Sequence, residues 1–414
     1  MNIVTPVLEL VGSLGLLLYG MKLMSDGVQK SAGEKLQRTL SVVTSNKVVA
    51  ILTGMLITMI IQSSGATTVM VVTFVNAGLI SLAQSAGVIF GANIGTTITA
   101  WIVSIFGFTF KISAFAVPVV GLGYFLSIFK KRKYQNIGEA IMGFGLLFLG
   151  LSGLSSVFTP DQLGWMLNIK GSGLSAIILG FLIGIVVTAL LHSSSAFSAI
   201  VITMAYNGLI SWELAAAMTL GSNVGSTVDS IMASMGTSAN GRRAALIHVM
   251  FNLFGTIVVL CFLKPFLELV MFITPGQENS NIAIRISMLH TVFNIITTCV
   301  MTPLSGKLVK IAEFLIKDDP SEKKKVFKLE FIEHSGKENV ATYIIQAEKA
   351  IADMTDVVTD MFDKIQIGVT KRNSSYVEKY AQEMADAEDY VDQMHEQITH
   401  FLVKCQGLQI TEKQ

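Results

Sequence analysis

Two short polar segments interrupt long apolar stretches of this 414-residue chain: Gln62-Ser63-Ser64-Gly65-Ala66 and His192-Ser193-Ser194-Ser195-Ala196. Their hydroxyl, amide and imidazole groups are suitable hydrogen-bond donors to a tetrahedral oxyanion. Hydroxyl and carbonyl oxygens are also hard ligands of the kind that suits sodium. Hydroxyls and small residues support a helix break, where freed backbone N–H groups and the positive helix N-terminus attract an anion. We therefore predict an oxyanion or sodium site at these segments.

A second pair of motifs follows the first along the chain: Gly91-Ala92-Asn93-Ile94-Gly95-Thr96-Thr97 and Gly221-Ser222-Asn223-Val224-Gly225-Ser226-Thr227. Glycine permits a helix break, asparagine tolerates a left-handed turn, and hydroxyls cap the helix beyond. We predict that each motif forms the tip or break of a second re-entrant segment. A plain packing role of the small residues is the alternative.

The chain contains an internal repeat, because both pairs of motifs are offset by 130 residues. Further segments match at this offset, the last one to within one position: Gly15–Gly20 with Gly145–Gly150, Gly54 with Gly184, Thr58 with Thr188, and Asn76–Ser81 with Asn207–Ser211. We predict two related units, with membrane repeat 1 at residues 1–140. Membrane repeat 2 and the final transmembrane helices follow at residues 141–310.

The composition is that of a membrane protein, with 51% apolar and only 14% charged residues. No Asp, Glu, Lys or Arg occurs between Lys47 and Lys111 or between Lys170 and Glu213. Each stretch is long enough for more than one helical crossing, which needs about 20 residues. The net charge of +1 argues against a nucleic-acid partner. The three cysteines fit neither a disulfide framework nor a zinc site.

Basic residues flank the apolar segments unequally in the two halves. The clusters are Lys22, Lys30, Lys35, Arg38 and Lys47; Lys130–Lys133; Arg242 and Arg243; and Lys307 and Lys310. Placing all of them in the cytoplasm requires the halves to run in opposite directions. The sequence thus predicts an all-α polytopic membrane protein with two inverted-topology repeats and re-entrant or broken helices, a common plan of secondary transporters.

The C-terminal part has a different, soluble character. Residues 311–340 form a charged linker, and residues 341–414 carry apolar side chains at alternating three- and four-residue spacing. This spacing predicts two amphipathic helices, separated near Lys371–Ser374 and packed as a C-terminal soluble helical hairpin. By the charge rule the hairpin and the C-terminus are cytoplasmic.

The paired motifs resemble those of the bacterial members of the type II sodium–phosphate cotransporter family. These carry Gln-Ser-Ser-Ser in each inverted half, each followed by a Gly-[Ala/Ser/Thr]-Asn-Ile-Gly-Thr-[Thr/Ser] motif. The resemblance covers about residues 7–310. The tail around Ala387–Asp392 is similar to part of the helical PhoU-type regulatory domain that is often fused to bacterial members, although it is short for a complete domain.

The resemblance implies a secondary transporter of the bacterial inner (plasma) membrane that couples sodium to inorganic phosphate by alternating access. Phosphate would contact the first motif of each half: Gln62, Ser63, Ser64, Gly65, Ala66, His192, Ser193, Ser194 and Ser195. Sodium would contact the second motifs and their neighbours: Gln62, Asn93, Thr96, Thr97, Asn223, Ser226, Thr227 and Asp229. The division of these residues between phosphate and sodium stays open. We expect no cofactor beyond the coupling sodium ions and no metal other than sodium; a homodimer is left open.

Two positions depart from the family pattern. Gly65 stands where a third serine is usual, which removes one hydroxyl, and His192 stands where glutamine is usual. Histidine titrates near neutral pH, so His192 would make transport pH-sensitive or let a proton replace a sodium ion. A neutral histidine that substitutes sterically for glutamine is the alternative.

Other polar groups lie in the apolar segments. Asp229, aligned with Thr99 of the first half, is an intramembrane carboxylate and hence a candidate cation ligand; pairing with Arg242 or Arg243 is the alternative. His248 and Asn252 share a helix face, as do His290 and Asn294. We expect hydrogen bonds between helices there rather than a metal site.

Other functions compete with sodium–phosphate symport. One is phosphate export, or proton-influenced oxyanion transport, by the same fold under control of the tail. An intramembrane serine hydrolase lacks a Gly-x-Ser-x-Gly elbow and leaves the duplication of the serines unexplained, so we expect no enzyme. A phosphate sensor that signals through the tail is a further alternative.

Overall fold

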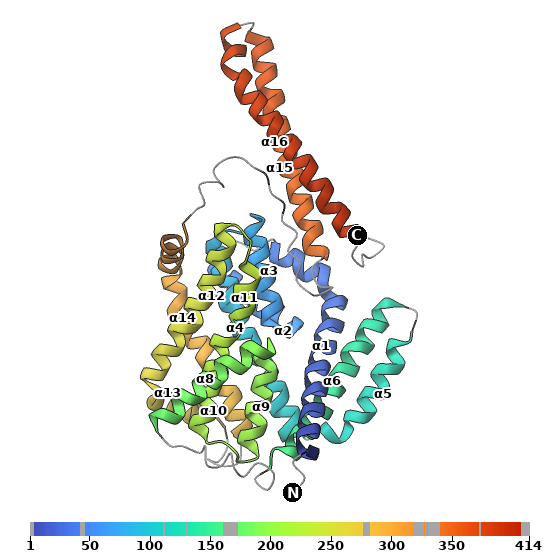
Figure 1. The fold of residues 1–414 in the computed structure, drawn as a ribbon, viewed down its shortest axis with the longest axis vertical. Coiled ribbons are helices and arrows are strands. Elements are labelled where there is room, and N and C mark those ends of the chain that lie inside the picture. The colour runs from blue at the N-terminus through green and yellow to red at the C-terminus, as the bar shows by residue number, and fades with distance from the viewer. Residues whose placement is uncertain are drawn as a thin grey trace.

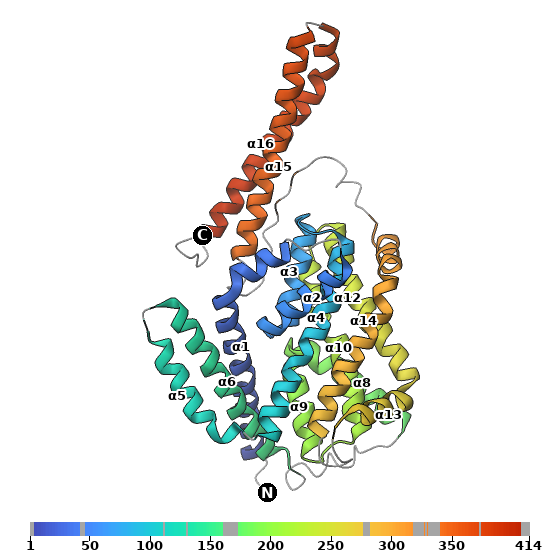
Figure 2. The same ribbon diagram turned by 180° about the vertical axis from the view of Figure 1, so that it is seen from behind.

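The computed structural model describes residues 4–41, 46–110, 112–129, 131–159, 173–275, 282–317, 327, 329, 340–371 and 374–406. These residues form helices joined by turns, and no strand occurs among them. Figures 1 and 2 show a bundle of helices from which one long helical pair projects. The structure confirms the predicted all-α fold class.

The helices fall into two successive sets and a tail. The first set is α1 (Val4–Ser41), α2 (Lys47–Ile61), α3 (Ser64–Asn76), α4 (Leu82–Ile102), the π-helix η1 (Val103–Thr109), the 3₁₀ helix η2 (Ile112–Phe115) and α5 (Ala116–Ser127). The second is α6 (Arg132–Val157), α8 (Leu174–Leu191), α9 (Ser194–Tyr206), α10 (Trp212–Gly225), α11 (Val228–Ser234), α12 (Ala239–Cys261), α13 (Leu263–Ile273) and α14 (Ile282–Leu315). The tail is α15 (Val340–Lys371) and α16 (Ser374–Gln406).

Among the described residues, six helical segments are long and apolar enough to cross a bilayer: Thr5–Ser31, Leu82–Thr109, Arg132–Val157, Leu174–Leu191, Ala239–Cys261 and Ile282–Leu315. The helices α2, α3, α5 and α9 are apolar but shorter. At 1.5 Å per residue, α2 reaches about 22 Å, against about 30 Å of hydrocarbon. The chain is therefore a multi-pass membrane protein that also contains apolar helices too short to span.

The first helices of the two sets, α1 and α6, pack against each other in opposite directions. Gly20 of α1 lies against the backbone at Leu147 of α6, and Gly150 of α6 lies against the backbone at Leu17 of α1. Both the glycines and the leucines are matched by the offset of 130 residues. The contact is therefore the same from both sides, as across a two-fold axis. This relationship supports the inverted repeat.

Within the first half, α2 and α4 run parallel and in direct contact. Gly91 lies against the carbonyl of Ile51, and Gly95 lies against the carbonyl of Met55, so the contact positions rise together along both helices. The helix α3 joins the end of α2 to the beginning of α4. Because α2 and α4 run parallel, α3 must run in the opposite direction to both. The helices α2 and α3 thus form a re-entrant pair whose tip lies at Gln62 and Ser63.

The second half repeats this arrangement with α8, α9 and α10. Gly221 lies against the carbonyl of Phe181, and Gly225 lies against that of Ile185. Each of these contacts is the contact of the first half shifted by 130 residues. The glycines are needed because an added Cβ would meet backbone, which cannot move aside as a flexible side chain can.

The prediction that Gly91–Thr97 forms a helix break is wrong, because α4 runs unbroken through this motif. Its glycines serve close packing against α2 instead. In the second half the helix does break at the end of the motif. There α10 ends at Gly225, Ser226 and Thr227 form a turn, and α11 begins at Val228.

The turns between α3 and α4 and between α9 and α10 match at the offset of 130 residues. Gly78 and Gly208 both take positive φ, +67° and +74°, which glycine adopts without strain. Ser81 and Ser211 then cap the N-termini of α4 and α10. The slip of one position near Asn76 therefore affects only the asparagine that precedes the turn.

The basic ends of the helices gather at one end of the molecule. The C-terminal ends of α1 and α14 and the N-terminal ends of α6 and α12 lie there, and α15 and α16 project from the same end (Figures 1 and 2). Arg243 of α12 donates from Nε to the carbonyl of Ile316, 2.9 Å away, which ties α12 to the end of α14. This grouping is the one that the charge rule requires of a cytoplasmic side.

The tail helices α15 and α16 form a hairpin that buries its own apolar seam. Tyr343 and Ala347 pack against Phe401 and Cys405. Helix α14 runs five residues beyond position 310, to Leu315, so the linker begins later than predicted. Most of the linker and residues 407–414 lie outside the described residues. The predicted boundary at residue 140 falls inside α6, which begins at Arg132.

Candidate functional site

Each polar segment forms the tip of a re-entrant pair by the same backbone geometry. Gln62 and His192 take left-handed φ angles of 61° and 50°, which non-glycine residues seldom adopt. Ser63 and Ser193 follow in extended conformation, and each hydroxyl accepts the backbone N–H three residues on, at 3.1 and 3.2 Å. The predicted helix breaks are therefore N-capped, and α3 and α9 begin with serine.

The chain folds back sharply at the first tip. The Thr58 hydroxyl donates to that of Thr67 at 3.0 Å, although residues nine apart in one helix would be separated by about 13.5 Å along its axis. In the second half the residue equivalent to Thr67 is Phe197, which has no hydroxyl. The Thr188 hydroxyl is fully buried there and has no hydrogen-bond partner among the described residues.

A chain of neutral hydrogen bonds joins the two halves. The Thr99 hydroxyl of α4 donates to Oε1 of Gln62 at 3.0 Å and accepts a weaker contact from the Ser195 hydroxyl of α9 at 3.4 Å. Thr99 belongs to the first half and Ser195 to the second. The two polar segments therefore meet at one place.

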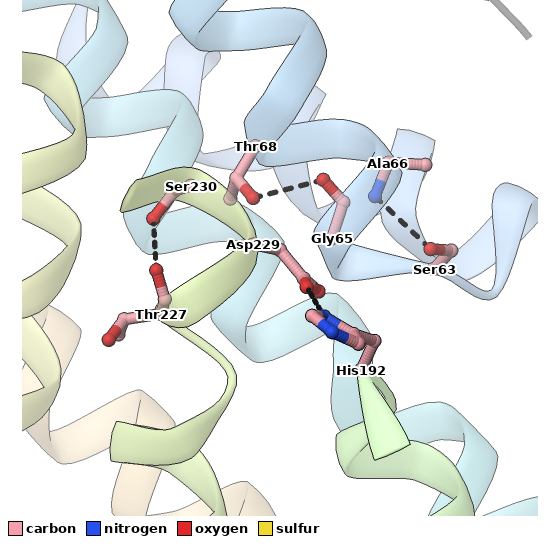
Figure 3. Close-up of polar contacts among 8 residues, drawn as sticks. All are labelled: Ser63, Gly65, Ala66, Thr68, His192, Thr227, Asp229 and Ser230. Carbon is pink, nitrogen blue, oxygen red and sulfur yellow. Dashed lines mark hydrogen bonds and ion pairs between the residues drawn. The ribbon is translucent and has the colours of Figure 1, made fainter. Parts of the chain in front are cut away.

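The equivalent contact of the other half joins two ionisable side chains. His192 Nδ1 lies 2.7 Å from Oδ1 of Asp229, and Figure 3 shows the Asp229 carboxylate between His192 and Gly65 of α3. The structure thus pairs Asp229 with His192 rather than with Arg242 or Arg243, both of which are described. The role of Asp229 as a cation ligand stays a prediction.

The residues of the second motifs bond mainly to their own helices. In α4, the side chains of Asn93, Thr96 and Thr97 donate to carbonyls three or four residues earlier, and all three are buried. In the second half, Ser226 and Thr227 donate to carbonyls three residues earlier. Each hydroxyl keeps its oxygen lone pairs, so a role as sodium ligand stays a prediction.

The histidines of the His–Asn pairs make hydrogen bonds between helices, as expected, whereas Asn252 and Asn294 donate to carbonyls of their own helices. His248 Nδ1 of α12 lies 2.9 Å from the Ser230 hydroxyl of α11, and His290 Nε2 of α14 lies 2.9 Å from Oδ1 of Asn223. In the part of the chain that is described, no group of three or more His, Cys, Asp or Glu side chains is arranged to hold a metal ion. Asn223, predicted as a sodium ligand, is thereby held in place by His290.

The two tips differ in burial. Residues 62–66 are half-buried, whereas Ser194 and Ser195 are only 6% and 8% exposed. His192 is exposed, and Ser193 beside it is half-buried. The first turn of α9 is therefore buried, whereas the first turn of α3 is more accessible.

Sequence reasoning did not include Thr99 among the site residues. Thr99 is the residue that bridges Gln62 to the other half, and it is 1% exposed. The signal was available, because Thr99 is the match of Asp229 at the offset of 130 residues. A residue matched to a candidate ligand in a duplicated site is itself a candidate.

Several known proteins are similar to this chain in sequence. YqeW of Bacillus subtilis (strain 168) is 29% identical over 304 residues, which make up 72% of this chain and 94% of that protein. The "Putative inorganic phosphate export protein YjbB" of Escherichia coli (strain K12) is 28% identical over 316 residues, 76% of this chain and 56% of that protein. The "Sodium-dependent phosphate transport protein 2B" of Rattus norvegicus is 33% identical over 131 residues, 31% of this chain and 18% of that protein.

The chain thus spans little more than half of YjbB and less than a fifth of the rat protein. No solved structure matches the chain. The sequence profile of the Na+/Pi-cotransporter family matches residues 16–156 and 166–297, which include both re-entrant tips. The chain belongs to the Na+/Pi-cotransporter family.

Proposed function

We propose that this protein is a secondary transporter that couples sodium to inorganic phosphate by alternating access. The observation that carries the proposal is the convergence of two oppositely placed helix breaks, joined by the contact between Thr99 and Ser195. Family membership and relatives named for phosphate transport support it.

The proposed site has the chemistry that a phosphate ion needs when it leaves water. The first backbone N–H groups of α3 and α9 have no partner within their helices, and the helix N-termini carry partial positive charge. Neighbouring hydroxyls add neutral donors, which bind phosphate without the strong hold of a permanent ion pair. Sodium would use the amide oxygens of Gln62, Asn93 and Asn223 together with neighbouring hydroxyl oxygens, the kind of site found in transporters with broken helices.

The direct test is flux in proteoliposomes that contain the purified protein. We expect labelled phosphate to accumulate when an inward sodium gradient is imposed, and accumulation to fall to the level of empty vesicles when potassium replaces sodium. Phosphate movement that is equal in sodium and potassium would contradict the coupling. An absence of phosphate movement in both would contradict the transport function.

Net phosphate export is a second candidate, favoured by the similarity to YjbB, a protein named for phosphate export. The same vesicles loaded with phosphate, with sodium placed inside or outside, distinguish the two directions. Proton influence through His192 is tested in parallel by the pH profile of flux in wild type and in His192→Gln. An identical pH profile in both proteins would contradict an influence of protons through His192.

The tail fits a regulatory role. The hairpin projects from the end of the molecule at which the basic helix ends gather, and we propose that this end is cytoplasmic (Figure 1). Its resemblance to part of a PhoU-type domain suggests control of flux in response to phosphate. Removal of residues 340–414 is expected to leave phosphate flux in place and to change its regulation.

A further inference from the structure

The two halves differ at one equivalent set of contacting residues. In each half, a tip residue contacts a residue 37 positions later, which in turn faces the first turn of the opposite re-entrant helix. The first set is Gln62, Thr99 and Ser195, and the matched set is His192, Asp229 and Gly65. All three positions of the set differ between the two halves, and the middle residue of each set lies against the other two. We therefore interpret the three differences together.

The geometry explains why residue 65 is glycine. A Cβ added to Gly65 would lie 2.5 Å from Oδ2 of Asp229, closer than two such atoms approach. The equivalent contact between Ser195 and Thr99 has room for a side chain on both partners. The hydroxyl that is missing at position 65 is therefore replaced in space by a carboxylate oxygen from α11.

The place that Asp229 takes is an anion position. Gly65 is the second residue of α3, and the backbone N–H groups of Ser64 and Gly65 precede the first donor that has a carbonyl partner within the helix. A carboxylate is stabilised at a helix N-terminus. Oδ1 of Asp229 faces the His192 imidazole, which is half exposed. The other carboxylate oxygen, Oδ2, faces α3.

The matched place at α9 has no carboxylate. Thr99, which is neutral, faces Ser195 there, and Ser194 and Ser195 are buried. One turn further, Ser198 is 2% exposed, and its hydroxyl has no hydrogen-bond partner among the described residues. Its match in α3, Thr68, donates to the carbonyl of Gly65 at 3.1 Å. The α9 turn therefore keeps an unused buried donor where the α3 turn has none.

We propose that Asp229 is a tethered anion that occupies the α3 N-terminus, so that phosphate binds against the α9 N-terminus, at Ser194, Ser195 and Ser198. This inference rests on the proposed function, since it divides the roles within the same site. Two anion positions are then filled by one fixed carboxylate and one mobile phosphate. The attraction of sodium to the space between two negative groups follows from this arrangement.

The matched serines at the start of each re-entrant helix test the assignment. Ser194→Ala is expected to raise the KM for phosphate about tenfold, since it removes a hydrogen bond to a charged group. Ser64→Ala, the same change at the matched position, is expected to raise it less than about threefold. Equal increases, or a larger increase for Ser64→Ala, would overturn the proposal. Ser156→Ala, an exposed hydroxyl on α6, serves as the control.

The carboxylate itself is tested by Asp229→Asn, which keeps its shape and removes its charge. We expect a lower KM for phosphate, by about threefold or more, and a higher sodium concentration for half-maximal flux. A higher or unchanged KM for phosphate in a folded variant would show that Asp229 is no competing anion. If this variant fails to fold, the comparison of Ser194→Ala with Ser64→Ala decides alone. Failure of the wild type to carry phosphate would instead contradict the proposed function.

Discussion

His192 Nδ1 lies 2.7 Å from Asp229 Oδ1, at the position where the other half joins Gln62 to Thr99 by a hydrogen bond of 3.0 Å. Both partners of one contact match both partners of the other. The duplicated halves have thus kept the geometry of the contact and changed its chemistry. The site therefore has ionisable residues on one side and neutral residues on the other.

The contact between His192 and Asp229 is expected to couple the two residues energetically. In a double-mutant cycle with His192→Ala and Asp229→Ala, we expect a coupling free energy of about 1 kcal/mol, a small value because the imidazole is half exposed. The thermal midpoint of the protein in detergent measures it. Additive effects of the two substitutions would mean that the contact contributes nothing to stability.

The fold-back at each tip provides a matched pair of stability tests. Thr188→Val is expected to stabilise the protein, or to leave it unchanged, because it removes a buried hydroxyl that has no hydrogen-bond partner among the described residues. Thr58→Val, at the matched position, removes the hydrogen bond to Thr67 and is expected to destabilise by about 1 kcal/mol. The thermal midpoints decide, and a loss of stability in Thr188→Val equal to that in Thr58→Val would contradict the distinction.

The re-entrant helices depend on close backbone contact. Gly54→Ala places a methyl group against the Val88 carbonyl, and Gly184→Ala places one against the Met218 carbonyl. Each is expected to destabilise by about 1–3 kcal/mol, the usual cost of overpacking, and to lower transport by displacing its tip. Gly121→Ala in α5 has nothing within 4 Å of the added atom and is the control. Wild-type stability and flux in Gly54→Ala would contradict the packing argument.

The tail hairpin is tested through Cys405, whose thiol is buried against Tyr343, Ala347 and Phe401. Burial raises the pKa of Cys405, so folding favours its neutral thiol. This contribution is present below the pKa of the unfolded thiol and is lost as the pH rises through the folded value. With Cys261 and Cys299 replaced by alanine, we expect slow alkylation at pH about 8, the pKa of an ordinary thiol being about 8.5, and faster alkylation in Phe401→Ala. Equal rates would show that the hairpin leaves Cys405 accessible.

The features that the sequence predicted correctly are local ones. The helix breaks follow from the serine caps within each polar segment, so they require no knowledge of the packing. The interpretation of Gly91–Thr97 failed because glycine serves both helix breaks and close helix contact. Which of the two applies depends on α2, a helix distant in sequence.

The contacts of Asp229 were out of reach for a related reason. A carboxylate near two arginines in sequence suggests an ion pair with them, but the structure brings His192 closer, from 37 residues earlier. The sequence showed that Gly65 stands where the family usually has serine, but it gave no reason for the difference. Its explanation required a neighbour from the other half of the protein.

The central claim is that the two breaks converge on one site that the transport cycle uses. Thr99→Cys and Ser195→Cys, combined in a protein without its three native cysteines, test it by oxidative cross-linking. Because the native hydroxyls lie 3.4 Å apart, we expect a disulfide that stops phosphate flux and a reductant that restores it. No cross-link, or a cross-linked protein that still carries phosphate at the wild-type rate, would contradict the account.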